Sequence, residues 1–249
     1  MRYSKKVKFT TTIILSAVMG ILSMPANALA QTKTLEVDLI WESLSYTPPF
    51  YKGKALYPHQ GEIIFVAMPN MIINGVRISP SQLTYTWKDR GEVMGSLSGL
   101  GKNSLTLKGS VITRTLDISV TVTAPDGNSA YKSIRVAPRS PALILYEDNP
   151  MYGIMYQNAI LDTFVMKNKE LRLLAAPYYV STVIPNTDPF VSYDWSINGA
   201  QINSTENNKD SVLLVRPDDT PIRSNVSVEM KNPKQILQYT ESAVLITHN

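Results

Sequence analysis

The sequence repeats itself at a spacing of 108 residues, and this repeat constrains the fold more than any other feature. Three pairs of segments match at that spacing: Glu62–Pro69 with Glu170–Pro177, Tyr85–Trp87 with Tyr193–Trp195, and Asp117–Val120 with Asn225–Val228. A period of about 100 residues is the size of one small β-domain. The sequence therefore predicts two copies of one module.

Apolar side chains alternate with polar ones in both copies, which is typical of half-buried strands. This alternation covers Leu35–Trp41 and Leu116–Val122 in the first copy, and Val191–Ile197 and Val226–Met230 in the second. Turn sequences rich in Gly, Asn and Pro separate the runs: Asn74–Gly75, Pro125–Asn128, Asn198–Gly199 and Pro217–Asp219. Short strands with such turns, and no helical stripe after residue 30, predict an all-β chain of two antiparallel β-sandwiches.

A short linker with two prolines separates the copies. Tyr131–Val136 is predicted to close the first copy and Ala142–Tyr146 to open the second. Proline removes backbone donors and stiffens a linker. We therefore predict domains at residues 31–138 and 139–249, arranged as an elongated pair with restricted bending.

Residues 1–30 have the three parts of a secretory signal peptide. A basic head, Met1–Lys8, precedes an apolar core of twelve residues, Ile13–Met24, and Ala28–Ala30 supplies the small residues that signal peptidase reads. The core is short for a membrane-spanning helix, which needs about 20 residues, and an uncleaved anchor is the alternative. We predict an exported mature chain from Gln31, secreted, periplasmic or at the cell surface, with no transmembrane segment.

The positive charge of the chain belongs to its first residues. The whole sequence has 24 basic and 20 acidic residues, but four basic residues lie within residues 1–30, so the mature chain is neutral. A nucleic-acid-binding protein would need the basic excess in its folded part, so nucleic acid is not an expected partner. The chain also has no cysteine, which excludes disulfides, thiolate metal sites and thiol nucleophiles.

A Tyr-x-Trp pair about twenty residues beyond an apolar strand that ends in Ala-x-Pro resembles the immunoglobulin-like (Ig-like) superfamily. The chain looks most like tandem bacterial PKD-like and related Ig-like extracellular modules, over roughly residues 35–248. Residues two apart on a strand point to the same face, so both members of each pair are expected in the core. The predicted core residues are Tyr85, Trp87, Tyr193 and Trp195. The resemblance implies extracellular spacing, adhesion or assembly, without catalysis.

The residues that usually carry catalysis or bind metals and cofactors form no recognisable motif. His59 and His248 belong to no metal-ligand cluster and are interpreted as a surface loop and a frayed tail. The glycine-rich segment Gly95–Ser104 lacks the Gly-Lys-Ser/Thr sequence of a phosphate loop, and Asn203–Asp210 is interpreted as a solvated loop. The sequence thus predicts no enzyme, no catalytic residue, no metal and no cofactor.

Aromatic residues are the candidates for contact with a ligand or partner: Trp41, Tyr46, Phe50, Tyr51, Tyr178 and Tyr179. Exposed rings on a sandwich stack on sugars or anchor a protein partner. The structural alternative is that the proline-rich stretch after Trp41 moves the first strand between sheets and closes the barrel end. Pro49–Tyr51 recurs as Pro150–Tyr152, at an offset of 101 residues, which favours that alternative. Met68–Ile73 is interpreted as an apolar loop.

The favoured function is non-enzymatic: surface assembly, adhesion or protein–protein interaction, with other envelope or surface proteins as partners. The alternative is a carbohydrate-binding module that uses the aromatic cluster on a polysaccharide. Residues 153–169, where the second copy is seven residues longer than the first, are the place to look for a function of the second copy alone.

Overall fold

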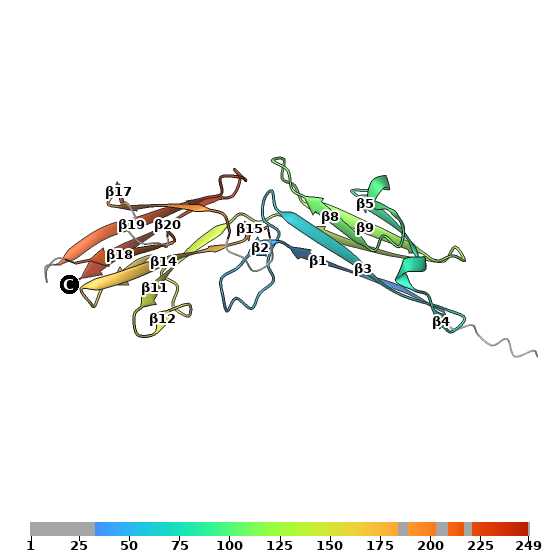
Figure 1. The fold of residues 1–249 in the computed structure, drawn as a ribbon, viewed down its shortest axis with the longest axis horizontal. Coiled ribbons are helices and arrows are strands. Elements are labelled where there is room, and N and C mark those ends of the chain that lie inside the picture. The colour runs from blue at the N-terminus through green and yellow to red at the C-terminus, as the bar shows by residue number, and fades with distance from the viewer. Residues whose placement is uncertain (1–32, 184–188, 203–208, 217–220, 249) are drawn as a thin grey trace, which may run out of the picture.

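The computed structural model describes residues 33–183, 189–202, 209–216 and 221–248. It consists of two Ig-like antiparallel β-sandwiches placed end to end (Figure 1), which confirms the predicted fold class. The described part contains no α-helix, and its short 3-10 turns are η1 (Pro80–Gln82) and η2 (Gly95–Leu97). The predicted signal peptide, the turn at Pro217–Asp219 and most of the polar segment Asn203–Asp210 lie outside the described residues.

The first module has two sheets that face each other across its core. One sheet has the order β1-β3-β4 with β8 also on β3, and it contains β1 (Thr34–Ser43), β3 (Glu62–Ile73), β4 (Val76–Arg77) and β8 (Ser104–Lys108). The other has the order β10-β9-β5-β6 with β7 also on β5, and it contains β5 (Thr84–Asp89), β6 (Glu92–Val93), β7 (Gly99–Leu100), β9 (Leu116–Thr123) and β10 (Ser129–Val136). Strands β1, β3 and β8 take the places of A, B and E in an Ig domain, and β5, β9 and β10 those of C, F and G.

The second module repeats this arrangement with additions. One sheet has the order β12-β11-β14-β18 and contains β11 (Ala142–Asn149), β12 (Gly153–Ile154), β14 (Glu170–Tyr178) and β18 (Ser211–Val215). The other has the order β13-β20-β19-β16-β17 and contains β13 (Thr163–Val165), β16 (Ser192–Ile197), β17 (Ala200–Ile202), β19 (Ile222–Lys231) and β20 (Tyr239–His248). The longer segment of the second copy forms β12 and β13, and β13 pairs in parallel with β20. The predicted domain boundary falls in the linker between β10 and β11.

The two copies place their tryptophans alike. Trp87 on β5 and Trp195 on β16 are 0% and 1% exposed, each at the centre of its module's core. Each indole Nε1 donates to a backbone carbonyl just before the E-like strand, at 2.8 Å to Lys102 and 3.1 Å to Lys209. A buried indole N–H needs such a partner, so the ring both fills the core and holds the loop that leads into β8 or β18.

The tyrosines of the two pairs differ. Tyr85 is fully buried and donates its hydroxyl to Pro80 O at 3.1 Å. Tyr193 is half-buried and packs against the edge of the second core. Tyr85 and Tyr193 therefore occupy the same strand position in the two modules, but the ring of Tyr193 is less completely buried.

The apolar segment Met68–Ile73, predicted as a loop, is instead the second half of β3, and Met71 is fully buried. Pro69 does not end the strand because of the direction in which its nitrogen points. Ala67 N donates to Asn103 O, on the side of β8, and backbone nitrogens two residues apart point the same way in a strand. β8 begins at Ser104, so position 69 faces a side without a neighbouring strand, where proline removes no ladder hydrogen bond.

Replacing Trp87 or Trp195 with Ala should lower the free energy of unfolding by about 3–5 kcal/mol. Each change empties the centre of a core and leaves a backbone carbonyl without its donor. Urea denaturation followed by circular dichroism measures the loss, with the exposed Tyr131→Ala as control. Stability close to that of the unmodified chain for either tryptophan variant would contradict its central role.

Candidate binding site at the junction of the modules

The modules are joined by a small sheet of their own. β2 (Ser45–Tyr46) follows β1 and pairs antiparallel with β15 (Val180–Ser181), which follows β14 (Figure 1). Two further hydrogen bonds extend the pairing: Tyr179 N to Tyr46 O at 2.9 Å and Thr182 N to Leu44 O at 3.1 Å. The prediction that this stretch moves β1 between sheets of its own module is therefore wrong, because its backbone is paired by the other module.

The linker between β10 and β11 is also held by the first module. Arg139 N donates to Tyr57 O at 2.8 Å, and His59 N donates to Arg139 O at 3.2 Å. His59 is thus part of the junction, contrary to its interpretation as a surface loop. The backbone pairing adds to the stiffness that the two prolines confer on the linker.

Gln238 is the polar centre of the junction. Its side chain is fully buried, between β19 and β20 of the second module. The amide nitrogen donates to His59 O at 2.5 Å and to Ser181 Oγ at 2.6 Å, and Oε1 accepts from Ser181 N and from Asn232 Nδ2, both at 3.0 Å. A buried amide is stabilising only when its donors and acceptors are satisfied, and here the first module supplies one of the partners.

Gln60 and Gly109 extend this contact. Gln60 Oε1 accepts from Leu237 N at 2.8 Å, and Gln60 O accepts from Gln235 Nε2 at 3.1 Å. Gly109 N donates to Gly61 O at 2.7 Å, and a Cβ at Gly109 would stand 2.7 Å from Gln60 Cα. Only glycine lets the loop before β9 lie so close to the segment that reaches the second module.

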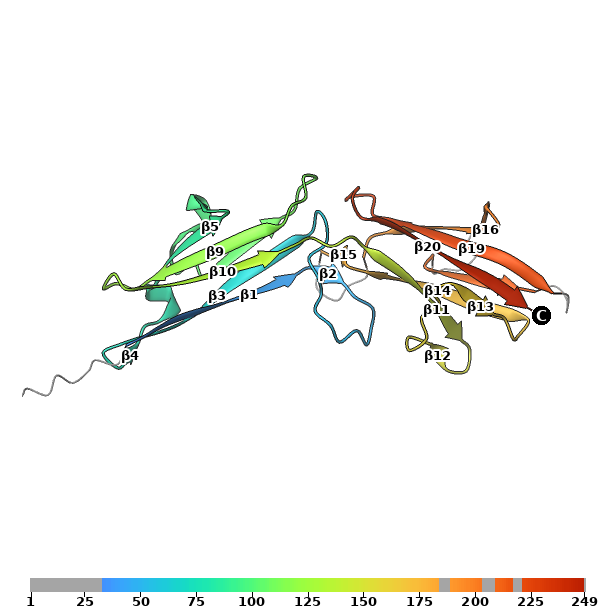
Figure 2. The same cartoon turned by 180° about the vertical axis from the view of Figure 1, so that it is seen from behind.

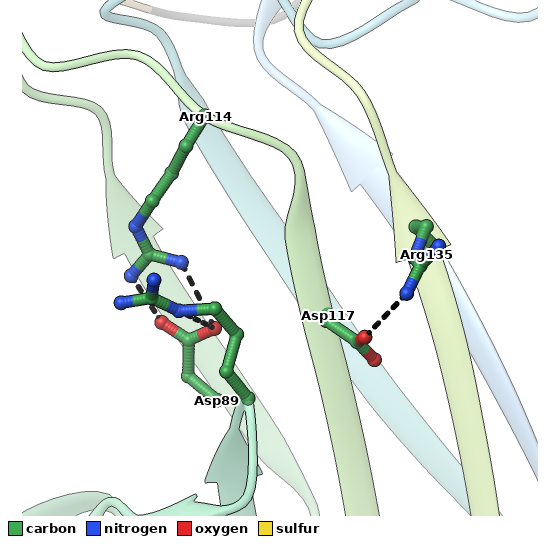
Figure 3. Close-up of polar contacts among 5 residues, drawn as sticks. Asp89, Arg114, Asp117 and Arg135 are labelled. Carbon is green, nitrogen blue, oxygen red and sulfur yellow. Dashed lines mark hydrogen bonds and ion pairs between the residues drawn. The ribbon is translucent and has the colours of Figure 1, made fainter.

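Charged pairs brace the same end of the first module (Figure 3). Arg114, in the loop before β9, binds both carboxylate oxygens of Asp89 at the end of β5, and Arg135 on β10 binds Asp117 on β9 at 2.9 Å. The hydrogen bond from Arg114 is the main reason that the pKa of Asp89 lies below its ordinary value. A two-point Arg–carboxylate contact fixes orientation as well as distance, so the loop is held in one position.

An aromatic cluster built from both modules lies beside these contacts: Phe50, Tyr51, Tyr146, Tyr156, Tyr178 and Tyr179. Tyr51 lies edge-on to Tyr178 and Tyr179, with centroid separations of 5.7 and 6.2 Å. The hydroxyls of Tyr51 and Tyr179 are 2.7 Å apart, and those of Tyr146 and Tyr178 are 2.9 Å apart. Edge-to-face pairs contribute about 0.5–1.5 kcal/mol beyond the area they bury, so the contacts of Tyr51 with Tyr178 and Tyr179 help to hold the modules together.

Phe50 differs from the other rings in combining high exposure with a strained backbone, since Tyr179, which also has a positive φ of 57°, is half-buried. Tyr51 N donates to Pro48 O at 3.2 Å, which places Phe50 at the third position of a turn, with a φ of 67°. This fits a type II turn, whose third position favours glycine. A bulky residue in the left-handed region costs about 1–2 kcal/mol, and little burial offsets that cost because the side chain is 84% exposed. Its ring lies 6.0 Å from that of Tyr156, across the junction.

A cleft of about 580 Å³ opens beside these rings. It is lined by Pro49, Phe50, Tyr51 and Lys52 from the first module, and by Ile154, Tyr156, Gln157 and Tyr178 from the second. Its volume lies in the range of about 300–1,000 Å³ that small-molecule sites occupy. Among the residues that the structure describes, the lining contains no carboxylate, and Lys52 is its one charged residue. Aromatic walls with a few polar groups are suited to binding and orienting a ligand.

The other two predicted contact residues lie elsewhere. Trp41 is half-buried against the first core, and Lys54 Nζ lies 3.4 Å from the centroid of its ring. That face of the indole is therefore covered. Tyr46 is half-buried in β2 and acts through its backbone in the pairing with the second module.

Two adjacent phenols of the cluster, Tyr178 and Tyr179, have raised pKa values. Burial, and next the hydrogen bond with Tyr51, raises the pKa of Tyr179 to about 12. Burial, and next the hydrogen bond with Tyr146, raises the pKa of Tyr178 as well. Neutral phenols near pH 7 are hydrogen-bond donors and acceptors for a ligand, and they do not supply a base or a nucleophile.

The remaining sequence candidates form no second site. His248 is the last residue of β20, with Nδ1 2.8 Å from Met166 O, so it is not a frayed tail. Across the described ranges, no three His, Asp or Glu side chains lie close enough to hold a metal ion. The same ranges contain no helix with the length and hydropathy needed to cross a membrane.

Tyr156, Gln157 and Gln238 contribute to the site but were not among the predicted contact residues. Tyr156 had a usable signal, since it lies close behind Pro150–Tyr152, the repeat of Pro49–Tyr51. Gln238 had none, because a glutamine between two strands looks like any exposed loop residue.

Comparisons with solved structures find distant similarities. Fibronectin(III)-like modules of Clostridium thermocellum CbhA are 10% identical, with 84% of this chain and 94% of that chain covered and a TM-score of 0.27. The N-terminal Ig1-2 module of the Drosophila receptor protein tyrosine phosphatase DLAR is 9% identical, with 86% and 99% covered and a TM-score of 0.28. A protein of the Bacteroides ovatus mixed-linkage glucan utilization locus, solved with a heptasaccharide, is 11% identical, with 84% and 70% covered and a TM-score of 0.24.

Similarities at these TM-scores carry no argument about function. No protein-family model matches the chain, and no curated protein matches it. The class of the protein follows from its own strand order: it is a tandem Ig-like β-sandwich protein whose modules share a junction sheet.

Gln238→Ala should loosen the junction while leaving both cores folded. It deprives His59 O and Ser181 N of their partners, a change that typically costs about 1–3 kcal/mol for a buried group. Small-angle scattering should show a wider range of inter-module distances. Gln201→Ala, at an exposed position of β17, is the matched control, and an unchanged distance distribution in the Gln238 variant would contradict the role assigned to this side chain.

Stability should fall as the pH rises from about 10 to about 12. The pKa of Tyr179 is higher in the folded chain, about 12, than its ordinary value of 10.0. The folded state therefore holds a proton that the unfolded state has released, and this stabilisation is complete below pH 10 and lost on the way to 12. Urea denaturation across this range should show a smaller fall for Tyr179→Phe; an equal fall would contradict the prediction.

Proposed function

We propose that the protein is a non-enzymatic binding protein of the cell surface or envelope, which acts in surface assembly, adhesion or protein–protein interaction. The observation that carries this proposal is the junction. β2–β15 pairing, the buried Gln238 and the tyrosine cluster hold two modules end to end. Relative motion is the default for domains of one chain. Here paired backbone, a buried amide and packed rings oppose that motion, so we infer that the junction sets a defined spacing.

The binding surface that we propose lies on one side of the junction. The segment between β2 and β3 and the hairpin of β11 and β12 project on the same side of the molecule in both views (Figures 1 and 2). Three large side chains on these segments are well exposed: Phe50 at 84%, Met151 at 82% and Tyr152 at 74%. Exposed aromatic and methionine side chains are typical anchors of protein interfaces.

The predictions about export, domain boundaries, partners and family are consistent with this role, and we propose them with it. The signal peptide of residues 1–30 would export the chain, and the mature domains would be 31–138 and 139–249. We propose envelope or surface proteins as the favoured partners, and membership of the bacterial PKD-like or related Ig-like extracellular modules. A carbohydrate-binding role is the second candidate, and the aromatic cleft of about 580 Å³ favours it.

Capture from envelope extract with residues 31–249 as bait, under mild crosslinking, tests the proposal. A specific partner should be retained by the unmodified chain and lost with the triple variant Phe50→Ala, Met151→Ala, Tyr152→Ala. The control is Val76→Ala with Val93→Ala, which removes side chains that are 62% and 57% exposed elsewhere on the first module. No specific partner, or a partner lost equally with the control, would contradict the proposed function.

A further inference from the structure

Phe50 occupies a position that folding alone does not favour. Its φ of 67° places a bulky side chain where a type II turn favours glycine, and its ring is 84% exposed. Strained backbone conformations are concentrated at binding and catalytic sites. The strain holds the ring out from the first module, beside Tyr156 of the second, with 6.0 Å between the ring centroids and 56° between the ring planes.

The size of the neighbouring cleft limits the kind of ligand that it can bind. A stable protein interface needs about 800 Å² of fairly flat surface on each partner, whereas this cleft is a hollow of about 580 Å³ between two projecting segments. An open cleft of this volume accommodates a short stretch of a narrow chain more readily than the face of a folded domain.

The chemistry of the side chains that line the cleft limits the class of ligand further. The faces of aromatic rings carry negative charge density and attract the weakly positive C–H groups on the face of a sugar ring. Tyr51, Tyr178 and Gln157 bring hydroxyl and amide groups to the same cleft, and these both donate and accept, as sugar hydroxyls do. The described lining residues, with one lysine and no carboxylate, provide little electrostatic selection for a multiply charged ligand.

We propose that this cleft binds a neutral polysaccharide chain, which stacks on Phe50 and Tyr156 and forms hydrogen bonds with Gln157 and the tyrosine hydroxyls. The inference rests on the second candidate function, the carbohydrate-binding role, and names its ligand and its site. The walls of the cleft come from both modules, so the ligand binds only the docked arrangement and stabilises it.

The variant Phe50→Gly separates binding from folding. Glycine fits the turn without strain, so the variant should unfold at the same or a higher urea concentration than the unmodified chain. Residues 31–249 should be retarded in native gels that contain a neutral β-glucan, α-glucan or galactomannan. Phe50→Gly should reduce that retardation at least tenfold, and Gln157→Ala should weaken it. Tyr131→Ala removes an exposed ring from β10 and should bind normally.

Several results would overturn the inference. They are no retardation of the unmodified chain by any neutral polysaccharide, normal binding by Phe50→Gly, or a clear loss of stability in Phe50→Gly. Displacement by a proline-rich peptide, or retardation only by a polyuronate, would show that the ligand belongs to another class. If envelope-protein capture persists while polysaccharide binding is absent, the inference fails and the proposed function stands. If polysaccharide binding is found without any protein partner, the cleft is a glycan site and the protein-assembly role fails.

Discussion

The pairing of β2 with β15 is the contact on which the arrangement of the molecule depends. The chain leaves the first module after β1, and its backbone groups must then find partners elsewhere. The second module supplies them along Val180–Ser181. Gln238 adds a further contact between the modules by donating a hydrogen bond to His59 O. Once these bonds form, the linker at Arg139 lies against residues 57–59. The aromatic residues of the two modules then come within contact of one another.

Within that cluster the rings fall into two groups with different physical roles. Tyr178 and Tyr179 meet Tyr51 edge-on, and the hydroxyl of Tyr179 is hydrogen-bonded to that of Tyr51, so they stabilise the docked arrangement. Phe50 does not, because its ring is exposed and its backbone is strained. The aromatic segment is therefore both structural and available for binding: Tyr51 and Tyr178 stabilise the junction and also line the cleft, whereas Phe50 is available for binding alone.

Much of the fold could be predicted from the sequence because its signals are local. The 108-residue repeat and the Tyr-x-Trp pairs predict two sandwiches with a buried tryptophan in each, since spacing and alternation are visible along one strand. The errors arose where a neighbouring strand decides the outcome. Pro69 was expected to end its strand, but its nitrogen faces a side without a partner strand, so β3 continues. The parallel pairing of β13 with β20 likewise depends on a strand about 80 residues away.

The sequence by itself determined the class of fold, its duplication and the absence of recognisable catalytic motifs. Only the tertiary structure decided which aromatic residues meet, because the decisive contacts join residues far apart in the chain. Tyr51 and Tyr179 are 128 positions apart, and His59 and Gln238 are 179 apart. Nothing in the local sequence of a tyrosine or a glutamine indicates such a partner, since burial and hydrogen bonding are properties of the packed surface. The candidate site exists because two modules dock, and docking is decided in three dimensions.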